Sequence, residues 1–329
     1  MAKFDKSKIS GRSFLVTGGA GFIGSNIVDY LLAHDAKLVR VLDDLSNGYK
    51  ENTTHNLNNS RYEFIQGDIR DLETCKRAVD GIEYISHQAA LGSVPRSIED
   101  PILTNSVNIS GFLNMLVAAK ESSSLVKFVY AASSSTYGDS KELPKIEGNE
   151  GKSLSPYAVT KAVNEYYADV FSKMYGFHAI GLRYFNIFGP RQNPDNPYAA
   201  VIPIFCKAYL EGTSPSINGD GETSRDFTYV DNAIQANMRA LFSDGIIQHE
   251  VFNVACGNRT SLNEIIDILK ELSNSSVEPT YGPERQGDVK HSLASIDKIT
   301  GSLGYEPSVR FKEGLTHVYN WYKEMTYIE

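Results

Sequence analysis

The chain has 329 residues, of which 41% are hydrophobic and 22% charged, and a formal net charge of −8 at pH 7. This composition is typical of a globular protein, and the length suffices for one large domain or two. The negative charge argues against a nucleic-acid backbone as the main partner, but not against a phosphorylated small molecule. The three dispersed cysteines offer neither a disulfide framework nor a CxxC metal site. We therefore expect a cytoplasmic protein without a metal.

The first half of the chain alternates short apolar runs with helical patterns. The runs at 13–17, 38–42, 62–66, 83–87 and 126–131 are suited to buried parallel strands. Helical patterns are found at 22–34, 71–79, 107–121 and from residue 157 to about 174, and a further strand is expected at 178–183. Alternation of this kind predicts an α/β fold with a Rossmann-type, doubly wound parallel sheet.

The second half is richer in loops. Residues 185–230 are rich in Gly, Pro, Asn and Asp, and helices are expected at 231–242, 262–272 and 312–325. Ser261-Leu-Asn-Glu264 is a capping-box pattern at the start of the second of these helices. We expect a Rossmann-type cofactor domain over residues 1–184 and a smaller α/β substrate domain over 185–329, with one or two segments exchanged between them. We expect no membrane span, because no apolar run approaches the necessary length.

A glycine-rich loop, Thr17-Gly-Gly-Ala-Gly-Phe-Ile-Gly24, lies between the first strand and the first helix. Its glycines allow a tight turn, close approach of a pyrophosphate and close helix–strand packing, while the helix N-terminus presents free N–H groups. The second strand ends at Asp43, about 20 residues further on, as a dinucleotide-binding fingerprint requires. The Asp43 carboxylate can accept hydrogen bonds from a ribose 2′-OH and would repel a 2′-phosphate, which favours NAD over NADP. A purely structural turn is the alternative.

Two further acidic residues are candidates for the adenosine end of the cofactor. Asp44 is either a solvated neighbour of Asp43 or shares the adenosine. Asp68 follows the third strand and is placed to meet the adenine, but it is equally a candidate N-cap for the helix at 71–79.

Tyr157 and Lys161 are four residues apart, so both side chains lie on one face of a helix. An ammonium group beside a phenol is expected to lower the phenol pKa from about 10, which would allow proton transfer at neutral pH. The same spacing recurs at Tyr319 and Lys323, so spacing alone is weak evidence. The hydroxyl-rich strand end at 133–136 lies about twenty residues before Tyr157 and favours a catalytic pair there, although such serines also satisfy their own turn.

The glycine loop, Asp43, Asp68, the strand-end serines and the Tyr157–Lys161 pair together resemble an extended short-chain dehydrogenase/reductase, from about residue 11 to about 324. Within this range, the segments at 181–190 (GLRYFNIFGP), 218–226 (NGDGETSRD) and 285–288 (RQGD) resemble the nucleotide-sugar 4-epimerases.

The resemblance implies a role for each matching residue. The catalytic residues it implies are Tyr157 as acid/base, Lys161 as its partner, and Ser133 with Ser134. The NAD-binding residues it implies are Gly18, Gly21, Phe22, Ile23, Gly24, Asp43, Asp44, Asp68, Ile69, Gln88, Tyr157 and Lys161. The substrate-binding residues it implies are Gly92, Ser93, Arg96, Ser133, Ser134, Ser135, Asn186, Val201, Arg225, Arg285, Asp288 and Ser292. Arg183 is a candidate structural ion-pair partner, and Arg225 and Arg285 also have a structural alternative.

The reaction implied by the resemblance is removal of the sugar 4-OH proton by Tyr157 and hydride transfer to NAD⁺. The resulting 4-keto sugar turns over and is reduced on its other face. Ser135-Thr136-Tyr137 lacks the carboxylate that follows the hydroxyl in similar dehydratases, which favours simple epimerisation. Ser292 falls where galactose-specific epimerases carry a bulky tyrosine beside the C2 substituent. We therefore expect a UDP-N-acetylhexosamine (UDP-GlcNAc and UDP-GalNAc) as substrate.

Other interpretations remain open from the sequence. A UDP-hexuronate or UDP-glucose/galactose 4-epimerase is the alternative within this class, and a regulatory protein that binds NAD or a nucleotide sugar is the alternative of another class. The resemblance also implies a homodimer formed by the helices at 107–121 and 157–174, with Leu113, Leu116 and Tyr166 as contacts.

Overall fold

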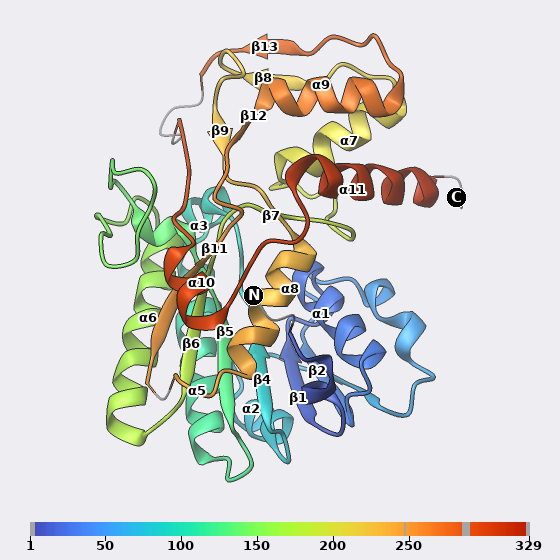
Figure 1. The fold of residues 1–329 in the computed structure, drawn as a ribbon. Helices are drawn as coiled ribbons and strands as arrows, with labels where there is room; N and C mark the ends of the chain where they lie inside the picture. Colours follow the sequence, from blue (N-terminus) through green and yellow to red (C-terminus); the bar gives the residue numbers. More distant parts are fainter. Residues whose placement is uncertain (1–3, 247, 285–289, 327–329) are drawn as a thin grey trace.

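The computed structural model describes residues 4–246, 248–284 and 290–326. Its centre is a seven-stranded parallel sheet in the order β11–β6–β5–β4–β1–β2–β3 (Figure 1). The strands of this sheet are β1 (Ser13–Thr17), β2 (Leu38–Asp43), β3 (Tyr62–Gln66), β4 (Tyr84–His87), β5 (Lys127–Ser133), β6 (Ala179–Tyr184) and β11 (Glu250–Val254). The predicted Rossmann-type fold is confirmed.

Helices cover both faces of the sheet. The helices α2 (Leu72–Val79), α5 (Phe112–Glu121) and α6 (Pro156–Tyr175) pack together on one face, while α1 (Phe22–Ala33) and α8 (Val230–Leu241) pack on the other. Alternation along β1 matches this arrangement, because Leu15 packs in one hydrophobic cluster and Phe14 and Val16 in the other. The strand order reverses at β1 and β4, which is where an open α/β sheet forms its ligand crevice.

A smaller lobe lies beyond the carboxyl ends of the strands (Figure 1). It contains α7 (Val201–Glu211), α9 (Leu262–Ser273) and α11 (Phe311–Thr326), and the capping box at the start of α9 is confirmed. Its paired short strands are β8 (Ser216–Asn218) with β13 (Thr280–Gly282), and β9 (Ser224–Arg225) with β12 (Thr260–Ser261). A third pair joins β7 (Ile187–Phe188) to β10 (Thr228–Tyr229). Further short elements are η1 (Lys6–Ile9), η2 (Lys50–Asn52), η3 (Thr54–Asn56), η5 (Ser134–Tyr137), α3 (Val94–Glu99) and α10 (Asp297–Leu303).

Two elements from the second half of the chain belong to the central sheet layer. Strand β11 pairs with β6 at the edge of the sheet, and α8 packs over β4, β5 and β6. We propose that the division near residue 184 separates the two lobes, with β11 and α8 as the segments that return to the first.

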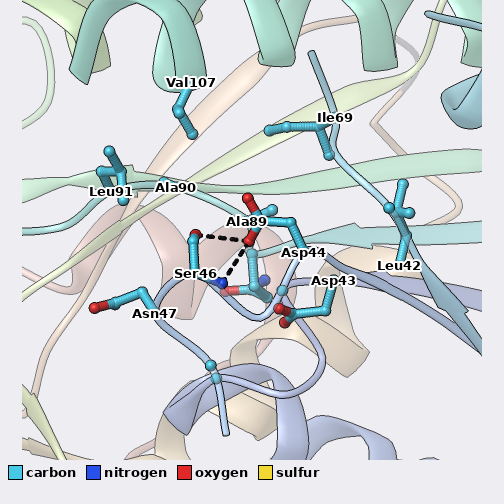
Figure 2. A pocket seen from close by; sticks show the side chains of 15 residues that line it. Leu42, Asp43, Asp44, Ser46, Asn47, Ile69, Ala89, Ala90, Leu91 and Val107 are labelled. Atoms are coloured by element: carbon cyan, nitrogen blue, oxygen red, sulfur yellow. Dashed lines mark hydrogen bonds between the residues drawn. The ribbon is translucent and has the colours of Figure 1, made fainter. Parts of the chain in front are cut away.

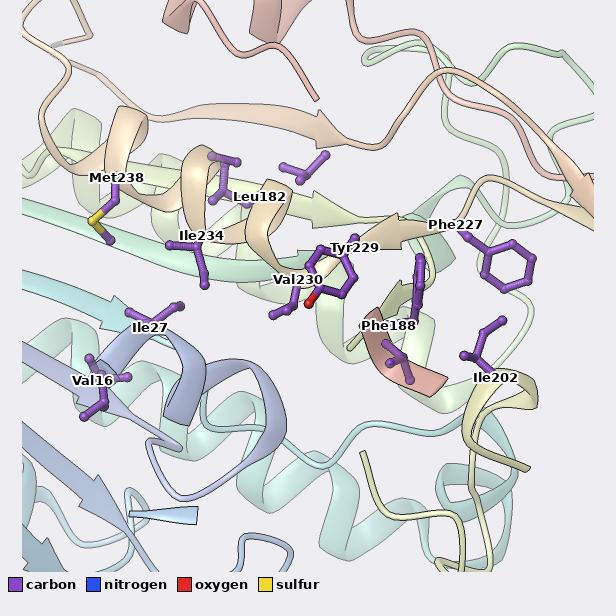
Figure 3. Packing of buried hydrophobic residues seen from close by; sticks show 14 of the residues in the cluster. Val16, Ile27, Leu182, Phe188, Ile202, Phe227, Tyr229, Val230, Ile234 and Met238 are labelled. Carbon is purple, nitrogen blue, oxygen red and sulfur yellow. The ribbon is translucent and has the colours of Figure 1, made fainter. Parts of the chain in front are cut away.

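The hydrophobic core is continuous between the lobes. On α8, Ile234 and Met238 lie over the sheet, near Ile27 of α1, and the same cluster extends to Phe188 and Phe227 beside the smaller lobe (Figure 3). Each fully buried side chain of this size stabilises the fold by about 1.5–3 kcal/mol. The position of the smaller lobe is therefore set by burial of apolar surface on α8 rather than by a flexible linker.

The helix predicted at 107–121 begins earlier than expected. Asp100 accepts a hydrogen bond from the Leu103 N–H and caps α4 (Pro101–Asn105), which continues through a π-helical segment, η4 (Ser106–Gly111), into α5. The continuous run Pro101–Glu121 is long and apolar enough to cross a membrane, which corrects the expectation that no run approaches that length. It is weak evidence for a membrane span, because 44% of the run is buried and core helices meet the same criteria.

Candidate active site

The glycine turn forms a cradle at the carboxyl end of β1. Gly18 has φ of +67°, and a Cβ atom there would lie 2.8 Å from the backbone N of Ala89. At Gly24 a Cβ atom would lie 2.1 Å from the Gly18 carbonyl oxygen. Gly21 is the N-cap of α1 and supplies no side-chain cap, so the first N–H groups of α1 are left for a phosphate. This arrangement fits the pyrophosphate of a dinucleotide.

Asp43 ends β2 beside this cradle and is largely buried. Its carboxylate accepts hydrogen bonds from the N–H groups of Ala20 at 2.9 Å and Leu45 at 2.8 Å. Burial raises the pKa of Asp43, and these two hydrogen bonds act in the opposite direction. Asp43 lines the pocket (Figure 2) and each of its oxygens can accept a further hydrogen bond, so the residues fit the ribose of NAD.

The other acidic candidates differ from Asp43. Asp44 lines the pocket and is exposed, and it accepts hydrogen bonds from the Ser46 N–H at 2.9 Å and hydroxyl at 2.6 Å (Figure 2). Asp68 accepts from the Arg70 Nε at 2.8 Å, and this interaction lowers the Asp68 pKa. The proposed N-cap role of Asp68 is wrong, because Asp71 caps α2. The cap lies one residue before the first helical residue, as the local backbone requires.

Gln88, one of the residues predicted to bind NAD, lines the pocket and belongs to a polar network whose other members were not found from the sequence. Gln88 donates to Ser86 Oγ at 2.9 Å and accepts from the Tyr184 hydroxyl at 3.1 Å, while Asn237 of α8 donates to Tyr184 at 2.7 Å. Asn108 of the π-helical segment donates to the Leu91 carbonyl at 3.1 Å and accepts from the Leu91 N–H at 2.8 Å. These contacts hold the pocket-lining segment 88–91 in place. No local pattern in the sequence indicated the residues other than Gln88, and the π-helical segment at Asn108, a feature often found at functional sites, is visible only in the structure.

His87, at the end of β4, is fully enclosed behind the cofactor pocket. Its Nδ1 lies 2.8 Å from Thr17 Oγ1, which also accepts a hydrogen bond from the Ala89 N–H. Burial lowers the pKa of His87 to about 3, with Lys161 acting in the same direction. His87 is therefore neutral at physiological pH, and its Nδ1 shares a hydrogen bond with the Thr17 hydroxyl.

This environment predicts a stability loss in acid. Between about pH 6.5 and 3 the unfolded chain binds a proton at His87 that the folded protein does not, so stability falls as pH falls through this window. The slope from this residue is about 1.4 kcal/mol per pH unit. Burial raises the Asp226 pKa to about 6, so this residue adds stability as the pH falls. Its contribution is the same in wild type and in His87→Gln and cancels in their comparison. Urea unfolding at pH 7.5 and 5.5 should show a smaller loss for His87→Gln than for wild type, and equal losses would contradict the assignment.

Tyr157 and Lys161 lie on one face of α6 as predicted, with the Lys161 Nζ 5.9 Å from the centre of the Tyr157 ring. The Nζ donates to the Ala131 carbonyl at 2.7 Å, and burial lowers the Lys161 pKa to about 8, against the effect of Glu165. The expectation that the lysine lowers the phenol pKa is wrong for the protein without cofactor. Burial raises the Tyr157 pKa, and the hydrogen bond with Ser133 is what acts against it.

The strand-end serines satisfy their own turn, which is the structural alternative predicted for them. Ser133 Oγ caps the η5 turn, accepting from the Ser135 N–H at 3.1 Å and hydroxyl at 2.9 Å, so the turn does satisfy itself. The same Ser133 hydroxyl interacts with Tyr157. Strand β5 extends two residues beyond the predicted end, and this extension carries Ser133 to the mouth of the sheet.

A cavity beyond η5 gathers residues from both lobes. Its lining includes Ser134, Ser135, Ala158, Asn186, Arg225 and Ser292. Asn186 and Arg225 also line an adjoining, more apolar cavity with Val201 and Phe205. Arg225 Nη1 donates to the Ser224 carbonyl at 3.1 Å, and Asn186 donates to the Asp226 carbonyl at 3.0 Å. Residues far apart in sequence thus meet around one connected space.

Other predicted site residues have different surroundings. Ser93 caps α3, and Arg96 donates to Asn47 at 3.0 Å and stacks on the Tyr198 ring, while the neighbouring Val94 and Pro95 line the cavity. Gly92 is exposed beside them. Phe22 and Ile23 form the first turn of α1. Arg285 and Asp288 lie outside the described residues.

Two structural alternatives are confirmed. Arg183 is buried and pairs with Glu165, its Nε donating at 2.9 Å, and with Glu150. Tyr319 is buried in the core on α11, so the second Tyr–Lys spacing belongs to packing. Within residues 4–246, 248–284 and 290–326, no group of three or more His, Cys, Asp or Glu residues is arranged to hold a metal ion.

Comparison with known proteins identifies the family. Residues 14–255 match the family model described as the NAD dependent epimerase/dehydratase family. A putative UDP-glucose 4-epimerase from Methanocaldococcus jannaschii is 38% identical over 311 residues, which are 94% of this chain and 98% of that protein.

Solved structures agree. The UDP-N-acetylglucosamine 4-epimerase from Methanobrevibacter ruminantium M1, in complex with UDP-N-acetylmuramic acid, has a TM-score of 0.90 at 39% identity, covering 96% of this chain and 99% of that one. The UDP-glucuronic acid 4-epimerase from Bacillus cereus, with UDP-glucuronic acid and NAD, has a TM-score of 0.87 at 32% identity, covering 95% and 99%. NAD as cofactor and an isomerase activity are thereby confirmed as predicted. The chain belongs to the NAD-dependent epimerase/dehydratase family of extended short-chain dehydrogenases/reductases.

Proposed function

We propose that this nucleotide-sugar 4-epimerase interconverts UDP-GlcNAc and UDP-GalNAc. The observation that carries the proposal is the shared cavity, which is lined by Ser134 and Ser135 of η5 together with Arg225 and Ser292 from the other half of the chain. Tyr157 lies beside it on α6, hydrogen-bonded to Ser133. Proton transfer, phosphate binding and sugar selection are thus available around one space.

The protein's own residues account for the proton transfers. NAD, when bound through the glycine turn, Asp43 and Lys161, supplies a reversible hydride acceptor. Tyr157 removes the proton from the sugar 4-OH, directly or through Ser133, and returns it to the same oxygen after C4 has been reduced on its opposite face. Burial raises the Tyr157 pKa, so the phenol needs a nearby positive charge to bring its pKa down toward neutral pH. We infer that Tyr157 becomes an effective base only once the cofactor pocket is filled.

The nucleotide half of the substrate fits the second cavity. Arg225 and Asn186 line both cavities and are placed to hold the pyrophosphate between them, since a guanidinium matches phosphate oxygens. Val201, at the start of α7, and Phe205 provide an apolar wall for the uridine. The Bacillus cereus and Methanobrevibacter ruminantium proteins, whose complexes contain UDP-sugars, support this assignment.

Ser292 favours an N-acetylated sugar. It lines the first cavity, which we call the sugar cavity, and its N–H donates to the Ser224 carbonyl at 3.0 Å, which fixes a small side chain in the lining. We infer that this lining leaves room for an N-acetyl group at C2. A UDP-hexuronate or UDP-hexose substrate is the alternative within the same chemistry.

An assay with purified protein tests the proposal. UDP-GlcNAc should be converted to its 4-epimer, detected by NMR, with NAD added. Ser292→Tyr should reduce kcat/KM for UDP-GlcNAc by about 10-fold or more, and kcat/KM for UDP-glucose much less. The larger side chain would occupy the space for the N-acetyl group, and pockets distinguish substrates that differ by a single methylene by about 10–200-fold. Equal effects on both sugars would remove Ser292 as the selecting residue. Binding of UDP-GlcNAc without any turnover would support the regulatory alternative.

We also propose a homodimer built on α6. The exposed apolar residues of this face are Val159, Tyr166, Val170 and Met174 on α6 and Ile102 on α4. Exposed apolar patches of this kind mark interaction sites. The prediction that Leu116 is a dimer contact is wrong, because this side chain is fully buried in the core of its own chain. The sequence could not separate the two cases, because apolar residues have the same helical spacing on a core face and on an interface face.

Tyr166→Asp is expected to convert the dimer to monomer. Tyr166 is 70% exposed in the single chain, so a carboxylate there is tolerated by the monomer but would be desolvated in the interface. Sedimentation equilibrium measures the change. Leu57→Asp, at an exposed apolar residue away from this face, is the control and should leave the dimer intact. A Tyr166→Asp protein that remains dimeric would place the interface elsewhere.

A cytoplasmic setting is part of the proposal. Cys75, Cys206 and Cys256 are all buried and free, and burial raises the pKa of each thiol. They are therefore protected from oxidation without forming a disulfide.

A further inference from the structure

Lys145 lines the sugar cavity together with Ser134, Ser135 and Ser292, and none of the sequence motifs includes it. It lies in the segment between η5 and α6 and is only 7% exposed. Its backbone is tied to the segment that carries Ser292. The Lys145 N–H donates to the Leu293 carbonyl at 2.7 Å, and the Ser295 N–H donates to the Lys145 carbonyl at 2.9 Å. These contacts fix Lys145 and Ser292 on the same wall.

The charge of Lys145 has little compensation. Its Nζ donates to the Ser140 carbonyl, which is neutral. Within the described residues no carboxylate forms an ion pair with it, and Glu142 acts on it only at longer range. Burial lowers the Lys145 pKa. An ammonium carries three donors and one of them is used on the Ser140 carbonyl, so this group can also donate to an acceptor supplied from the cavity.

We propose that Lys145 is a specificity-determining residue, whose ammonium donates a hydrogen bond to the acyl oxygen of the sugar's C2 substituent. The inference rests on the proposed function, because it takes Ser292 as the residue beside C2. Ser292 then provides the room for the N-acetyl group, and Lys145 provides its polar partner. A hexose carries only a hydroxyl at C2, which projects less far toward this wall.

The effect expected from this contact is selective. Hydrogen bonds to a charged group are among the stronger ones, and their loss corresponds to about a 10- to 100-fold change in kcat/KM. A residue that merely holds the 139–155 segment in shape would change the handling of every UDP-sugar alike. Discrimination between sugars therefore separates the two roles.

The experiment compares Lys145→Met with wild type on UDP-GlcNAc, UDP-glucose and UDP-glucuronate, measuring kcat/KM and, by calorimetry, Kd. We expect at least a 10-fold loss of kcat/KM and a weaker Kd for UDP-GlcNAc, with less than a 3-fold change for UDP-glucose. Lys152→Met, at an exposed lysine of the same segment, is the matched control and should behave as wild type.

Each other outcome overturns the inference in a defined way. Equal losses on all three sugars would make Lys145 a structural clamp on Ser140. A loss confined to UDP-glucuronate would assign the ammonium to a sugar carboxylate instead. If wild type epimerises none of the sugars, the proposed function fails, whereas the Kd comparison still reports whether Lys145 distinguishes the acetylated sugar.

Discussion

Tyr157→Phe is expected to reduce turnover by about 10²- to 10⁴-fold, the range that a positioned acid–base group contributes. The substitution removes the hydroxyl that interacts with Ser133 and leaves the ring on α6 in place. NAD should still bind, because the substitution leaves the glycine turn, Asp43 and Lys161 in place. The measurements are kcat by NMR for UDP-GlcNAc and Kd for NAD by calorimetry.

Two controls make this result specific. Tyr319→Phe changes the second Tyr–Lys spacing within the core and should retain wild-type turnover. Ser133→Ala removes the hydroxyl that interacts with Tyr157 and should reduce kcat less than Tyr157→Phe, because the tyrosine remains. Near-normal turnover of Tyr157→Phe would move the proton transfer to another residue.

Gly24→Ala is expected to abolish measurable NAD binding and to lower the melting temperature. A Cβ atom at Gly24 would lie 2.1 Å from the Gly18 carbonyl oxygen, so the turn has to open or α1 has to move away from β1. Either change displaces the N–H groups that are placed for the pyrophosphate. Backbone on both sides of the contact cannot relax as a flexible side chain would, and overpacking typically costs about 1–3 kcal/mol.

The comparison protein is Gly301→Ala in α10. A Cβ atom at Gly301 meets nothing within 4 Å, so this change should leave NAD binding intact and slightly raise stability, since alanine favours the helix. Calorimetry with NAD and thermal unfolding measure both effects. If Gly24→Ala binds NAD with unchanged affinity, the glycine turn is not the phosphate site.

Local pattern predicted the strands β1 to β6 with ends within two residues of those observed. Buried parallel strands read as continuous apolar runs, and each run here is bounded by polar or glycine residues. Strand β11 was not predicted, and neither were the two- and three-residue strands of the smaller lobe. Strands of that length carry no periodicity, and their pairing depends on partners far away in the chain.

The sequence predicted the helix α8 but not where it packs. The helix was predicted at 231–242 and is observed at Val230–Leu241, but its pattern indicated only an amphipathic helix. Packing over β4, β5 and β6 brings Asn237 to Gln88 behind the cofactor pocket, although 149 residues separate them. Such a contact is invisible in sequence because side-chain spacing describes one helix and not what it packs against.

By itself the sequence determined the chemistry available to this protein: a glycine turn followed by Asp43, strand-end serines, and Tyr157 four residues before Lys161. Each signal is a short local pattern, and the predicted parallel sheet places the carboxyl ends of its strands at one edge. The fold alone decided how those groups behave. It brought Lys145 and Ser292 to one wall, and it raised the Tyr157 pKa where the spacing with Lys161 had suggested a lower one. Desolvation depends on every segment that covers a group, and only the folded chain specifies those segments.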